Sequence, residues 1–393
     1  MIETKFKQTE LGPIPEDWEV GTFADFLTTF SAGATPYRGI PDNFIGQIPW
    51  ISSGELNYCE INDTREHISL DAQRNTHLTV HKPGTFLIAI TGLEAAGTRG
   101  RCAFVKTPST TNQSCLAINS TDKMTVKYLF WFYRQWSDYL AFNFSQGSKQ
   151  QSFTAEIAKR LPTYAPLYQE QVAIAEALND VDALIRELDA LIDKKKAVLQ
   201  GTKHELLTGS LRLPGFSKPR KEITIEDICK ITTGNSNTQD QIESGAYPFY
   251  IRSAQIVRSN RYLFDCEGVV TIGDGQIGKV FHYVSGKFDL HQRCYLMYDF
   301  NGVNVKFFYF LFSYFFYDRA IALSAKATVD SVRRDMIAKM KLDIPEIEEQ
   351  KAIVVILSDM DTEITELEAK RDKYAAIRQG MMQQLLTGKI RLI

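Results

Sequence analysis

The 393-residue sequence has little net charge and no excess of glycine or proline. Lysine and arginine total 45 against 47 aspartate and glutamate, a formal charge of −2, so the chain lacks the overall basic excess typical of a nucleic-acid binder. With 24 glycines, 13 prolines and 44% apolar residues, collagen-like and disordered chains are excluded. The length predicts two or three folded domains.

Metal-binding and secretory patterns are also missing. The six cysteines form no CxxC pair and have no histidine at ligand spacing, so we expect reduced, mostly buried thiols and no structural zinc. The first residues show no secretory pattern, and the apolar run Val303–Tyr317 is interrupted by Lys306. Since this run is too short to span a bilayer, we expect a buried helix and a cytoplasmic protein.

No catalytic motif is complete. HExxH, GxSxG, a GxGxxG after a strand and the Asn-Pro-Pro-aromatic box of adenine methyltransferases are all absent. The segment GDGQIGK (Gly273–Lys279) fits a phosphate-binding loop, but Val280 follows where serine or threonine would hold magnesium. We therefore expect a hairpin turn here, no catalytic centre and no metal site.

An internal repeat is the strongest signal in the sequence. At an offset of 179, Gln171–Leu213 aligns without gaps with Gln350–Leu392, and 21 of 43 positions are identical. The two segments end in the similar strings LLTGSLRL (Leu206–Leu213) and LLTGKIRL (Leu385–Leu392). Duplication for packing alone could produce such a match, so the extent of the repeat becomes important.

The repeat extends over both halves of the chain. The same offset pairs Pro166 with Pro345, VKYLFWF (Val126–Phe132) with VKFFYFL (Val305–Leu311), and Gln113 with Gln292. Further upstream the offset becomes 200, where PWISSGEL (Pro49–Leu56) lies over FYIRSAQI (Phe249–Ile256). The halves share a frame and differ in loop length, as two recognition tasks on one scaffold require.

Each matched tail carries apolar residues at alternating steps of four and three, the seam of a coiled-coil helix. In the second copy Arg371, Tyr374 and Arg378 take the later seam positions, so the stripe weakens there. We expect helices, the first from about Gln169 to Leu207, that bury their seams against each other as an antiparallel pair. The predicted seam residues are Ile174, Leu178, Val181, Ile185, Leu188, Ile192, Ile353, Leu357, Met360, Ile364 and Leu367.

Two glycines occur at equal positions within these helices. Gly201 and Gly380 each cost about 1 kcal/mol relative to alanine in a helix interior. We expect them to mark a bend or close packing.

The remaining sequence predicts two α+β domains with an internal pseudo-two-fold repeat. Short β-type runs separated by glycine-rich turns precede an aromatic helix near Lys127–Tyr139 and another near Lys306–Tyr317. The predicted order is a first globular domain (1–165), a helical spacer (166–213), a second globular domain (214–344) and a C-terminal helical spacer (345–393). An antiparallel pairing of the spacers would separate the two domains.

Basic and amide side chains gather on predicted turns of both globular domains. Arginine, lysine and glutamine hold phosphates and read base edges, and residues 214–340 carry 16 basic against 13 acidic side chains. Such turns are also simply hydrophilic. The candidate DNA-binding residues are Tyr37, Arg38, Arg99, Arg101, Lys149, Gln150, Arg252, Gln255, Arg258, Gln276, Lys279 and Lys326.

Domain order and motifs together resemble the specificity subunit of type I restriction–modification enzymes. The resemblance spans the whole chain and is carried by LGPIPEDWEV (Leu11–Val20), APLYQEQVAIAEAL (Ala165–Leu178), IPEIEEQKAIVVIL (Ile344–Leu357) and the two LLTG-x-x-RL endings.

The resemblance implies that each globular part is a target recognition domain that reads one half of a bipartite double-stranded DNA sequence. It implies that the helical spacers set the gap and dock two modification (methyltransferase) subunits, and that restriction/translocase subunits join for cleavage. The chain itself would be non-catalytic and hold no cofactor, with S-adenosylmethionine and ATP on the partner subunits.

Two other classes stay open on the residues alone. A non-catalytic coiled-coil adaptor without DNA specificity would share the repeat and the seams. A nucleotide-dependent enzyme would depend on the incomplete Gly273–Lys279 loop.

Overall fold

The structure is a computed structural model that describes residues 5–324 and 331–392. The chain divides into two units, one comprising Met1–Glu187 and Lys370–Ile393 and the other Leu188–Ala369. Each division falls inside a long helix, α5 (Tyr168–Thr208) or α9 (Ile347–Leu385).

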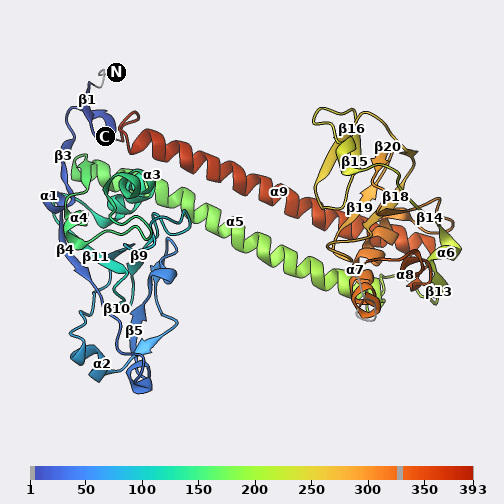
Figure 1. The fold of residues 1–393 in the computed structure, drawn as a ribbon, viewed down its shortest axis with the longest axis horizontal. Helices are drawn as coiled ribbons and strands as arrows, with labels where there is room; N and C mark the ends of the chain where they lie inside the picture. Colours follow the sequence, from blue (N-terminus) through green and yellow to red (C-terminus); the bar gives the residue numbers. More distant parts are fainter. Residues whose placement is uncertain (1–4, 325–330, 393) are drawn as a thin grey trace. The chain divides into compact units, whose positions relative to one another are not determined.

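The first unit contains a five-stranded sheet in the order β4-β11-β8-β9-β6, a three-stranded sheet in the order β10-β5-β7, and the pairs β1-β2 and β12-β3. Its strands are β1 Phe6–Thr9, β2 Gly12–Pro15, β3 Glu19–Thr22, β4 Leu27–Ala32, β5 Ile48–Ile51, β6 Glu60–Ile61, β7 His67–Ile68, β8 Phe86–Ala89, β9 Cys102–Val105, β10 Thr110–Thr111, β11 Cys115–Ser120 and β12 Pro162–Ala165. Its other helices are α1 Phe23–Phe26, α2 Leu70–Asn75, α3 Val126–Phe144 and α4 Ala155–Lys159, with 3-10 turns at Pro41–Phe44 and Ser53–Glu55 (Figure 1).

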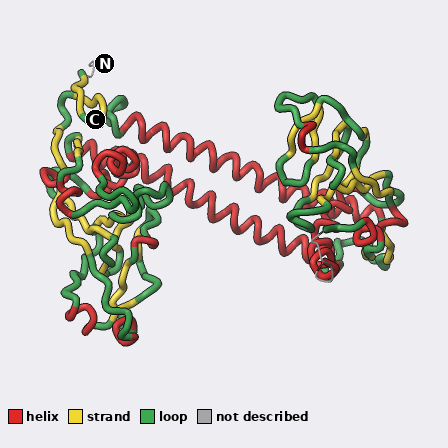
Figure 2. The backbone as a smooth tube through the Cα atoms, in the orientation of Figure 1, coloured by secondary structure: helices red, strands yellow, loops and turns green. Residues whose placement is uncertain are grey.

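The second unit contains four-stranded sheets in the orders β14-β21-β18-β19 and β16-β15-β20-β17, together with the pair β13-β22. Its strands are β13 Lys221–Thr224, β14 Lys230–Thr233, β15 Tyr247–Tyr250, β16 Ile256–Ser259, β17 Phe264–Asp265, β18 Gly268–Ile272, β19 Phe281–Val284, β20 Lys287–Leu290, β21 Cys294–Tyr298 and β22 Lys341–Ile344. Its other helices are α6 Ile225–Ile228, α7 Val305–Ser324 and α8 Arg334–Ala338, with a 3-10 turn at Thr238–Asp240; Figure 2 shows strands and helices mixed in this unit as in the first.

The two units repeat one topology. The order β4-β11-β8-β9 corresponds to β14-β21-β18-β19, the parallel pair β10-β5 corresponds to β20-β15, and the closing pair β12-β3 corresponds to β22-β13. This correspondence confirms the mixed helix and sheet content and the repeat that the sequence predicts.

The strand register corrects the upstream offset. Thr110 and Thr111 pair with Trp50 and Ile51 in the first unit, while their equivalents at an offset of 179 pair with Phe249 and Tyr250 in the second. Ile51 therefore corresponds to Tyr250, at an offset of 199, and the offset of 200 is wrong by one residue. Since successive strand residues point to opposite faces, a one-residue slip exchanges the buried and exposed sets.

The strands that the β-type runs predict are confirmed within one or two residues at their ends, and both aromatic helices are present as α3 and α7. The predicted runs are Thr85–Thr91, Cys102–Val105, Ser114–Ile118, Val269–Ile272, Lys279–Val284 and Cys294–Tyr298. The segment GDGQIGK connects the antiparallel strands β18 and β19, so the hairpin turn is confirmed. Helix α7 buries Phe307, Phe308, Phe312 and Phe316. In the part of the chain that the structure describes, no helix combines the length and apolarity needed to cross a bilayer.

The beginning of each long helix is buried by its own globular part as well as by the other helix. In the first unit Ile174 and Leu178 share a core with Trp18, Phe132 and Tyr164 and with Met382, Leu385 and Leu386 at the end of α9. In the second, Ile353 and Leu357 share a core with α7 and with Leu199, Leu206 and Leu207 at the end of α5. The seam prediction named only the opposite helix as partner, and the globular contacts are an addition.

Every predicted seam position is buried or half-buried in the structure. Val181, Met360 and Leu367 are half-buried, and the other eight are buried, namely Ile174, Leu178, Ile185, Leu188, Ile192, Ile353, Leu357 and Ile364. Arg378, which replaces an apolar residue in the weaker stripe, forms an ion pair with Asp182 of α5. The polar end of the stripe thus still contacts the opposite helix.

Ion pairs show the relative direction of the two long helices within each unit. In the first unit Glu170 pairs with Arg391 and Asp182 with Arg378, so higher numbers on α5 meet lower numbers at the end of the chain. In the second, Lys195 lies 2.7 Å from Glu363 and Arg212 lies 2.7 Å from Glu349. The paired segments are antiparallel in both units.

The repeated motif PxxxEQ, at Pro166–Gln171 and Pro345–Gln350, is explained by hydrogen bonds that its glutamine makes. The Nε2 of Gln171 donates to the carbonyl of Pro166 and its Oε1 accepts from the amide of Thr125, the N-cap of α3. Gln350 makes the equivalent bonds to Pro345 and Asn304 before α7. Each glutamine therefore ties the start of a long helix to the start of an aromatic helix.

The glutamate of the same motif binds the arginine of the opposite LLTG-x-x-RL ending. Glu170, whose side chain is fully buried, accepts two hydrogen bonds from Arg391 at 2.7 and 2.8 Å. Glu349 accepts two from Arg212 at 2.8 and 2.7 Å. The PxxxEQ motif of one copy thus contacts the LLTG-x-x-RL ending of the other copy. The first unit holds the contact of Glu170 with Arg391, and the second unit holds the contact of Glu349 with Arg212.

Gly201 and Gly380 do not mark close packing. An added Cβ at either position would meet no heavy atom within 4 Å among the described residues. The expectation of tight contact is therefore wrong, because both positions face open space on the surface of their helices.

Candidate nucleic-acid interface

One surface turn has the same construction in both units. In the first unit it follows β10 and contains Asn112, Gln113 and Ser114; in the second it follows β20 and contains His291, Gln292 and Arg293. The backbone amide of Asn112 donates to the carbonyl of Ile51 at 2.9 Å, and that of His291 donates to the carbonyl of Tyr250 at 3.0 Å. We call these segments the glutamine turns.

A side chain caps each glutamine turn in the same way. The Oδ1 of Asn112 accepts from the amide of Ser114 at 3.0 Å, and the Nδ1 of His291 accepts from the amide of Arg293 at 3.1 Å. Because the turn is closed by its own first residue, the glutamine between is held outward. Gln113 and Gln292 are both exposed.

A glycine brings a second segment against each turn. A Cβ at Gly33 would lie 1.9 Å from the carbonyl oxygen of Thr111, and a Cβ at Gly234 would lie 1.8 Å from that of Leu290. Only glycine permits this approach. It places Thr35 and Asn237 beside the turns, where each bonds to the side chain of the glutamine.

A buried hydrogen-bond network supports the second glutamine turn. The carboxylate of Asp289, which is fully buried, accepts from the Oγ of Ser236 at 2.5 Å and from the Nε of Arg261 at 3.2 Å. Because both carboxylate oxygens have a donor, the charge is compensated. The network fixes the Gly234–Asn237 segment against β20.

A cationic cluster lies next to Gln292. Arg252 and Arg293 both donate to the carboxylate of Asp274, at 3.1 and 2.7 Å. Partial burial opposes ionisation of Asp274, but the hydrogen bonds from Arg293 and Arg252 hold its pKa below the usual value. Two guanidinium groups share one carboxylate, so the cluster keeps a net positive charge beside a hollow of about 410 Å³ that Gln292 and Arg293 help to line.

Several candidate arginines are engaged in fixing loops. Arg38 donates two hydrogen bonds of 2.8 Å to Glu66 and lies over the ring of Phe44, and the Nε of Arg99 lies 2.6 Å from Asp138. The Nε of Arg101 donates to the carbonyl of Gly97, and that of Arg258 donates to the carbonyl of Gly245. These contacts give the four arginines a role in fixing their loops.

The other candidates present their side chains differently. Arg252 joins the cluster at Asp274, and the Nζ of Lys279 lies 5.5 Å from the ring centroid of Tyr317. The side chains that are exposed on turns are Tyr37, Lys149, Gln150, Gln255 and Gln276. Lys326 lies outside the described residues.

The structure brings some of these segments together. In the first unit the amide of Gln151 donates to the carboxylate of Glu94 at 2.9 Å, so the turn with Lys149 and Gln150 meets the loop with Arg99 and Arg101. In the second unit Asp274 joins Arg252 to the loop with Gln276 and Lys279. The Tyr37–Arg38 segment packs elsewhere, against Phe44 and Trp50.

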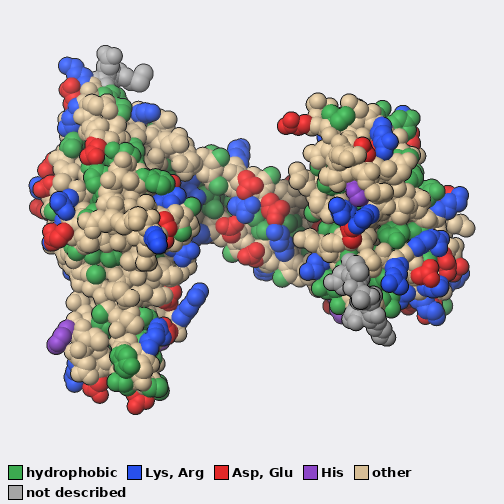
Figure 3. Space-filling model, in the orientation of Figure 1, with side chains coloured by type: hydrophobic (Ala, Val, Ile, Leu, Met, Phe, Trp, Pro, Cys, Tyr) green, Lys and Arg blue, Asp and Glu red, His purple; other side chains and the backbone are tan. Residues whose placement is uncertain are grey.

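Gln113, Gln292 and Arg293 were not among the sequence candidates. The signal for the two glutamines was present, because they match at an offset of 179. Arg293 had no such signal, since its equivalent in the first copy is Ser114. Figure 3 shows basic and acidic side chains interspersed over the visible surface of each unit, so charge alone does not mark the turns.

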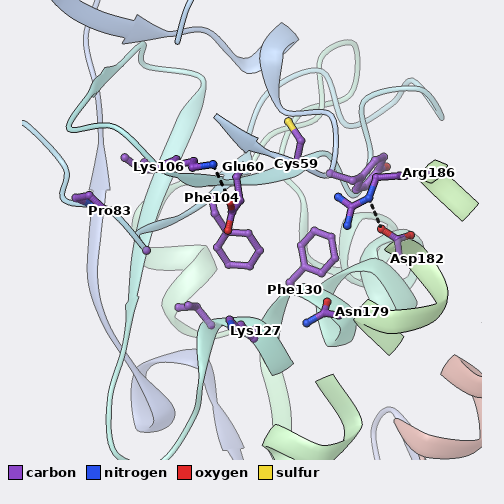
Figure 4. A pocket seen from close by; sticks show the side chains of 14 residues that line it. Cys59, Glu60, Pro83, Phe104, Lys106, Lys127, Phe130, Asn179, Asp182 and Arg186 are labelled. Carbon is purple, nitrogen blue, oxygen red and sulfur yellow. Dashed lines mark ion pairs between the residues drawn. The ribbon is translucent and has the colours of Figure 1, made fainter. Parts of the chain in front are cut away.

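A hollow of about 550 Å³ in the first unit lies where α3 and α5 meet β9 (Figure 4). Among its lining residues, Glu60 pairs with Lys106 at 3.8 Å and Asp182 with Arg186 at 3.7 Å. Its carboxylates thus have cationic partners, and none of the candidate DNA-binding residues lines it. The cysteines are free, and burial raises the pKa of the Cys229 and Cys294 thiols to about 12, which keeps them un-ionised at neutral pH.

Comparisons with known proteins agree with this architecture. The family model for the type I restriction modification DNA specificity domain matches twice, at residues 15–196 and 218–375. The specificity subunit of the type I restriction enzyme MjaIX of Methanocaldococcus jannaschii is 31% identical over 188 residues, which cover 47% of this chain and 42% of that relative. The putative MjaX specificity subunit of the same organism is 24% identical over 99% of this chain and 97% of its own length.

Solved structures share the fold. The specificity subunit of a type I restriction–modification system from M. genitalium matches with a TM-score of 0.66 and 15% identity, over 97% of this chain and 98% of that one. A chain from a structure concerning complex assembly and conformational transition of the type I R-M system matches with a TM-score of 0.55 and 13% identity, over 96% and 99%. With two copies of the domain covering most of its length, the chain belongs to the type I restriction–modification DNA specificity family.

Proposed function

We propose that the chain is the DNA sequence-recognition subunit of a type I restriction–modification complex. Each globular part is a target recognition domain that reads one half of a bipartite double-stranded DNA target. The observation that carries this proposal is one scaffold built twice with the same glutamine turn and unlike loops around it: Ile51 and Gln113 are 62 positions apart, whereas their equivalents Tyr250 and Gln292 are 42 apart. A rigid frame with variable loops suits two readers of different sequences.

The proposed domain limits are 1–165 and 214–344 for the readers, and 166–213 and 345–393 for the helical spacers. The closing pairs β12-β3 and β13-β22 support these limits, because each joins the two ends of a globular part just before a long helix begins. The spacers act as an antiparallel coiled coil that separates the readers and relates them by a pseudo-two-fold axis. The antiparallel ion pairs in each unit support this.

The spacers also dock two modification subunits, and the chain itself is non-catalytic. Partners bind S-adenosylmethionine and methylate the DNA, and restriction/translocase subunits use ATP where they are present. The near-neutral charge of the chain supports this division, because partners can supply the cations that neutralise phosphates. We place the complex in the cytoplasm, where the DNA target is.

Candidate contacts fall into two sets under this proposal. The side chains available to the duplex are Tyr37, Lys149, Gln150, Arg252, Gln255, Gln276 and Lys279. Arg38, Arg99, Arg101 and Arg258 position the loops through their protein acceptors. Arg252 stays in the available set because it shares the single carboxylate of Asp274 with Arg293. Lys326 stays a candidate outside the described residues.

Single-molecule sequencing of modified bases tests the proposal, in a host with its modification subunits and with or without this chain. We expect a two-part motif with a fixed gap to be methylated only when the chain is present. An adaptor without DNA specificity predicts no change in the methylated motifs. A gel shift of the assembled complex on the identified duplex and on a scrambled one is the direct companion measurement.

A further inference from the structure

We propose that Gln113 and Gln292 grip the sugar–phosphate backbone of the two half-sites, so that both readers seat on DNA through the same contact before their loops select bases. This inference rests on the proposed function. It assigns the two glutamines to holding the duplex and leaves sequence selection to the surrounding loops.

The first step is that both side chains are held by a residue of the same neighbouring segment, Gln113 through its amide oxygen and Gln292 through its amide nitrogen. The Oγ1 of Thr35 donates to the Oε1 of Gln113 at 2.5 Å, and the Nε2 of Gln292 donates to the Oδ1 of Asn237 at 2.5 Å. Each glutamine is thus exposed but oriented by a residue of the segment that the close-packed glycine places beside it. An oriented amide loses less side-chain entropy on binding than a free one.

The second step concerns donors. A glutamine amide carries two N–H donors. The bond from Thr35 uses the oxygen of Gln113 and leaves the NH₂ group for an outside acceptor. Gln292 uses one hydrogen on Asn237 and keeps the other. Phosphate oxygens are acceptors only, and glutamine side chains are among the usual phosphate-contacting groups.

The third step is the identity of the two residues. The loops around the turns differ in length and sequence, as readers of different bases require, yet the exposed residue at this one place is the same. The same side chain on the same turn does not by itself distinguish two unlike sequences. It can hold what both half-sites share, and every duplex shares its backbone.

Charge next to the turn supports a phosphate more than a base. Arg293 follows Gln292 directly, and Arg293 and Arg252 share the single carboxylate of Asp274. The cluster is therefore net positive beside the Gln292 amide. In the first unit the equivalent neighbour is Ser114, whose hydroxyl can also donate to a phosphate.

The test uses the full chain assembled with its modification subunits and a fluorescent duplex that carries the target found by methylation sequencing. Gln113→Glu keeps the length of the side chain and an acceptor for Thr35, but places a carboxylate where a phosphate would lie. We expect the Kd to rise about tenfold, the size of a hydrogen bond to a charged group. The rise should be equal on the target and on duplexes with either half-site scrambled, and Gln292→Glu should behave likewise.

Two comparison variants make the result decisive. Gln8→Glu in the β1-β2 hairpin, also exposed, adds the same charge elsewhere and should leave the Kd within twofold. Gln113→Ala removes the amide without a new charge and should raise the Kd by a smaller factor, which keeps the test informative if the glutamate variant unfolds at a lower temperature. A Kd that is unchanged in both Gln113→Glu and Gln113→Ala overturns the inference.

A loss confined to duplexes with an intact first half-site also overturns it, since Gln113 would then read bases. Failure of the proposed function has a different signature. In that case the wild-type complex itself would bind target and scrambled duplexes equally, whatever the glutamine variants did.

Discussion

At the scale of single residues, the arginines separate into those that hold the chain together and those that face outward. Arg391 and Arg212 each bind a buried glutamate of the opposite copy, whereas Arg252 and Arg293 share one carboxylate at the surface. The sequence could show that these residues are basic and lie on turns. It could not show that Glu66 lies against Arg38 or Asp138 against Arg99, because those partners are distant in the chain.

Replacing Arg391 tests the contact between the two repeated motifs. Arg391→Met leaves the buried carboxylate of Glu170 without its cation, and we expect a loss of about 3 kcal/mol in the free energy of unfolding. Adding Glu170→Gln should recover much of this loss, because the orphaned charge is removed. Urea unfolding of both variants checks the pair, and a single-variant loss below about 0.5 kcal/mol, the level of an exposed ion pair, contradicts it.

His291 makes the stability of the second unit sensitive to acid. Burial, with the charges of Arg252 and Arg293, lowers the pKa of His291 below its usual 6.5. The unfolded chain therefore takes up a proton near pH 6.5 that the folded chain refuses, so stability is lost as the pH falls below that value. His291→Asn copies Asn112, the cap of the first glutamine turn, and should give a shallower fall in melting temperature between pH 7.5 and 5.5.

The control for this variant is His77→Asn, at an exposed position. Stability at pH 7.5 should be close to wild type in both proteins. An unchanged pH profile for His291→Asn would mean that His291 does not contribute to acid sensitivity.

At the scale of elements, length and periodicity decided what could be predicted. The helices α5 and α9 are visible in the sequence because an apolar seam recurs over many turns. Strands such as β10, with two residues, and helices such as α4, with five, are too short to show a period. The sequence analysis therefore did not predict the glutamine turn after β10, although its glutamine was part of the repeat.

Glycines at the helices give a matched pair of substitutions. Gly201→Ala and Gly380→Ala place a methyl group in open space, and each should raise the free energy of unfolding by about 1 kcal/mol. Gly388→Ala should lower it, because the residue has φ +68° and its Cβ would lie 2.3 Å from the Cγ of Pro15. Calorimetry of the three variants checks the signs, and stabilisation by Gly388→Ala would contradict the packing at this helix end.

At the scale of the whole molecule, the account depends on two readers and a spacer of fixed length. The family and the repeated domain follow from the sequence, since the motifs of the repeat are long and specific. The target bases do not, because they are set by loops whose geometry no pattern in one sequence specifies.

Lengthening the spacer tests its role. Four residues inserted near Leu188, with four more near its repeat equivalent Leu367, add about 6 Å of rise and just over one helical turn, which nearly preserves the seam. We expect the methylated motif to keep both half-sites and to change its gap by about one or two base pairs. An unchanged gap in the methylation pattern would show that the helices do not set the spacing.

Exchange of one reader tests the central claim most directly. Residues 214–340 are replaced by the corresponding segment of a relative, and modified bases are sequenced in a host that supplies the modification subunits. The account predicts that one half-site of the methylated motif changes while the other half-site and the gap stay the same. A change in both half-sites would contradict two independent readers on one chain.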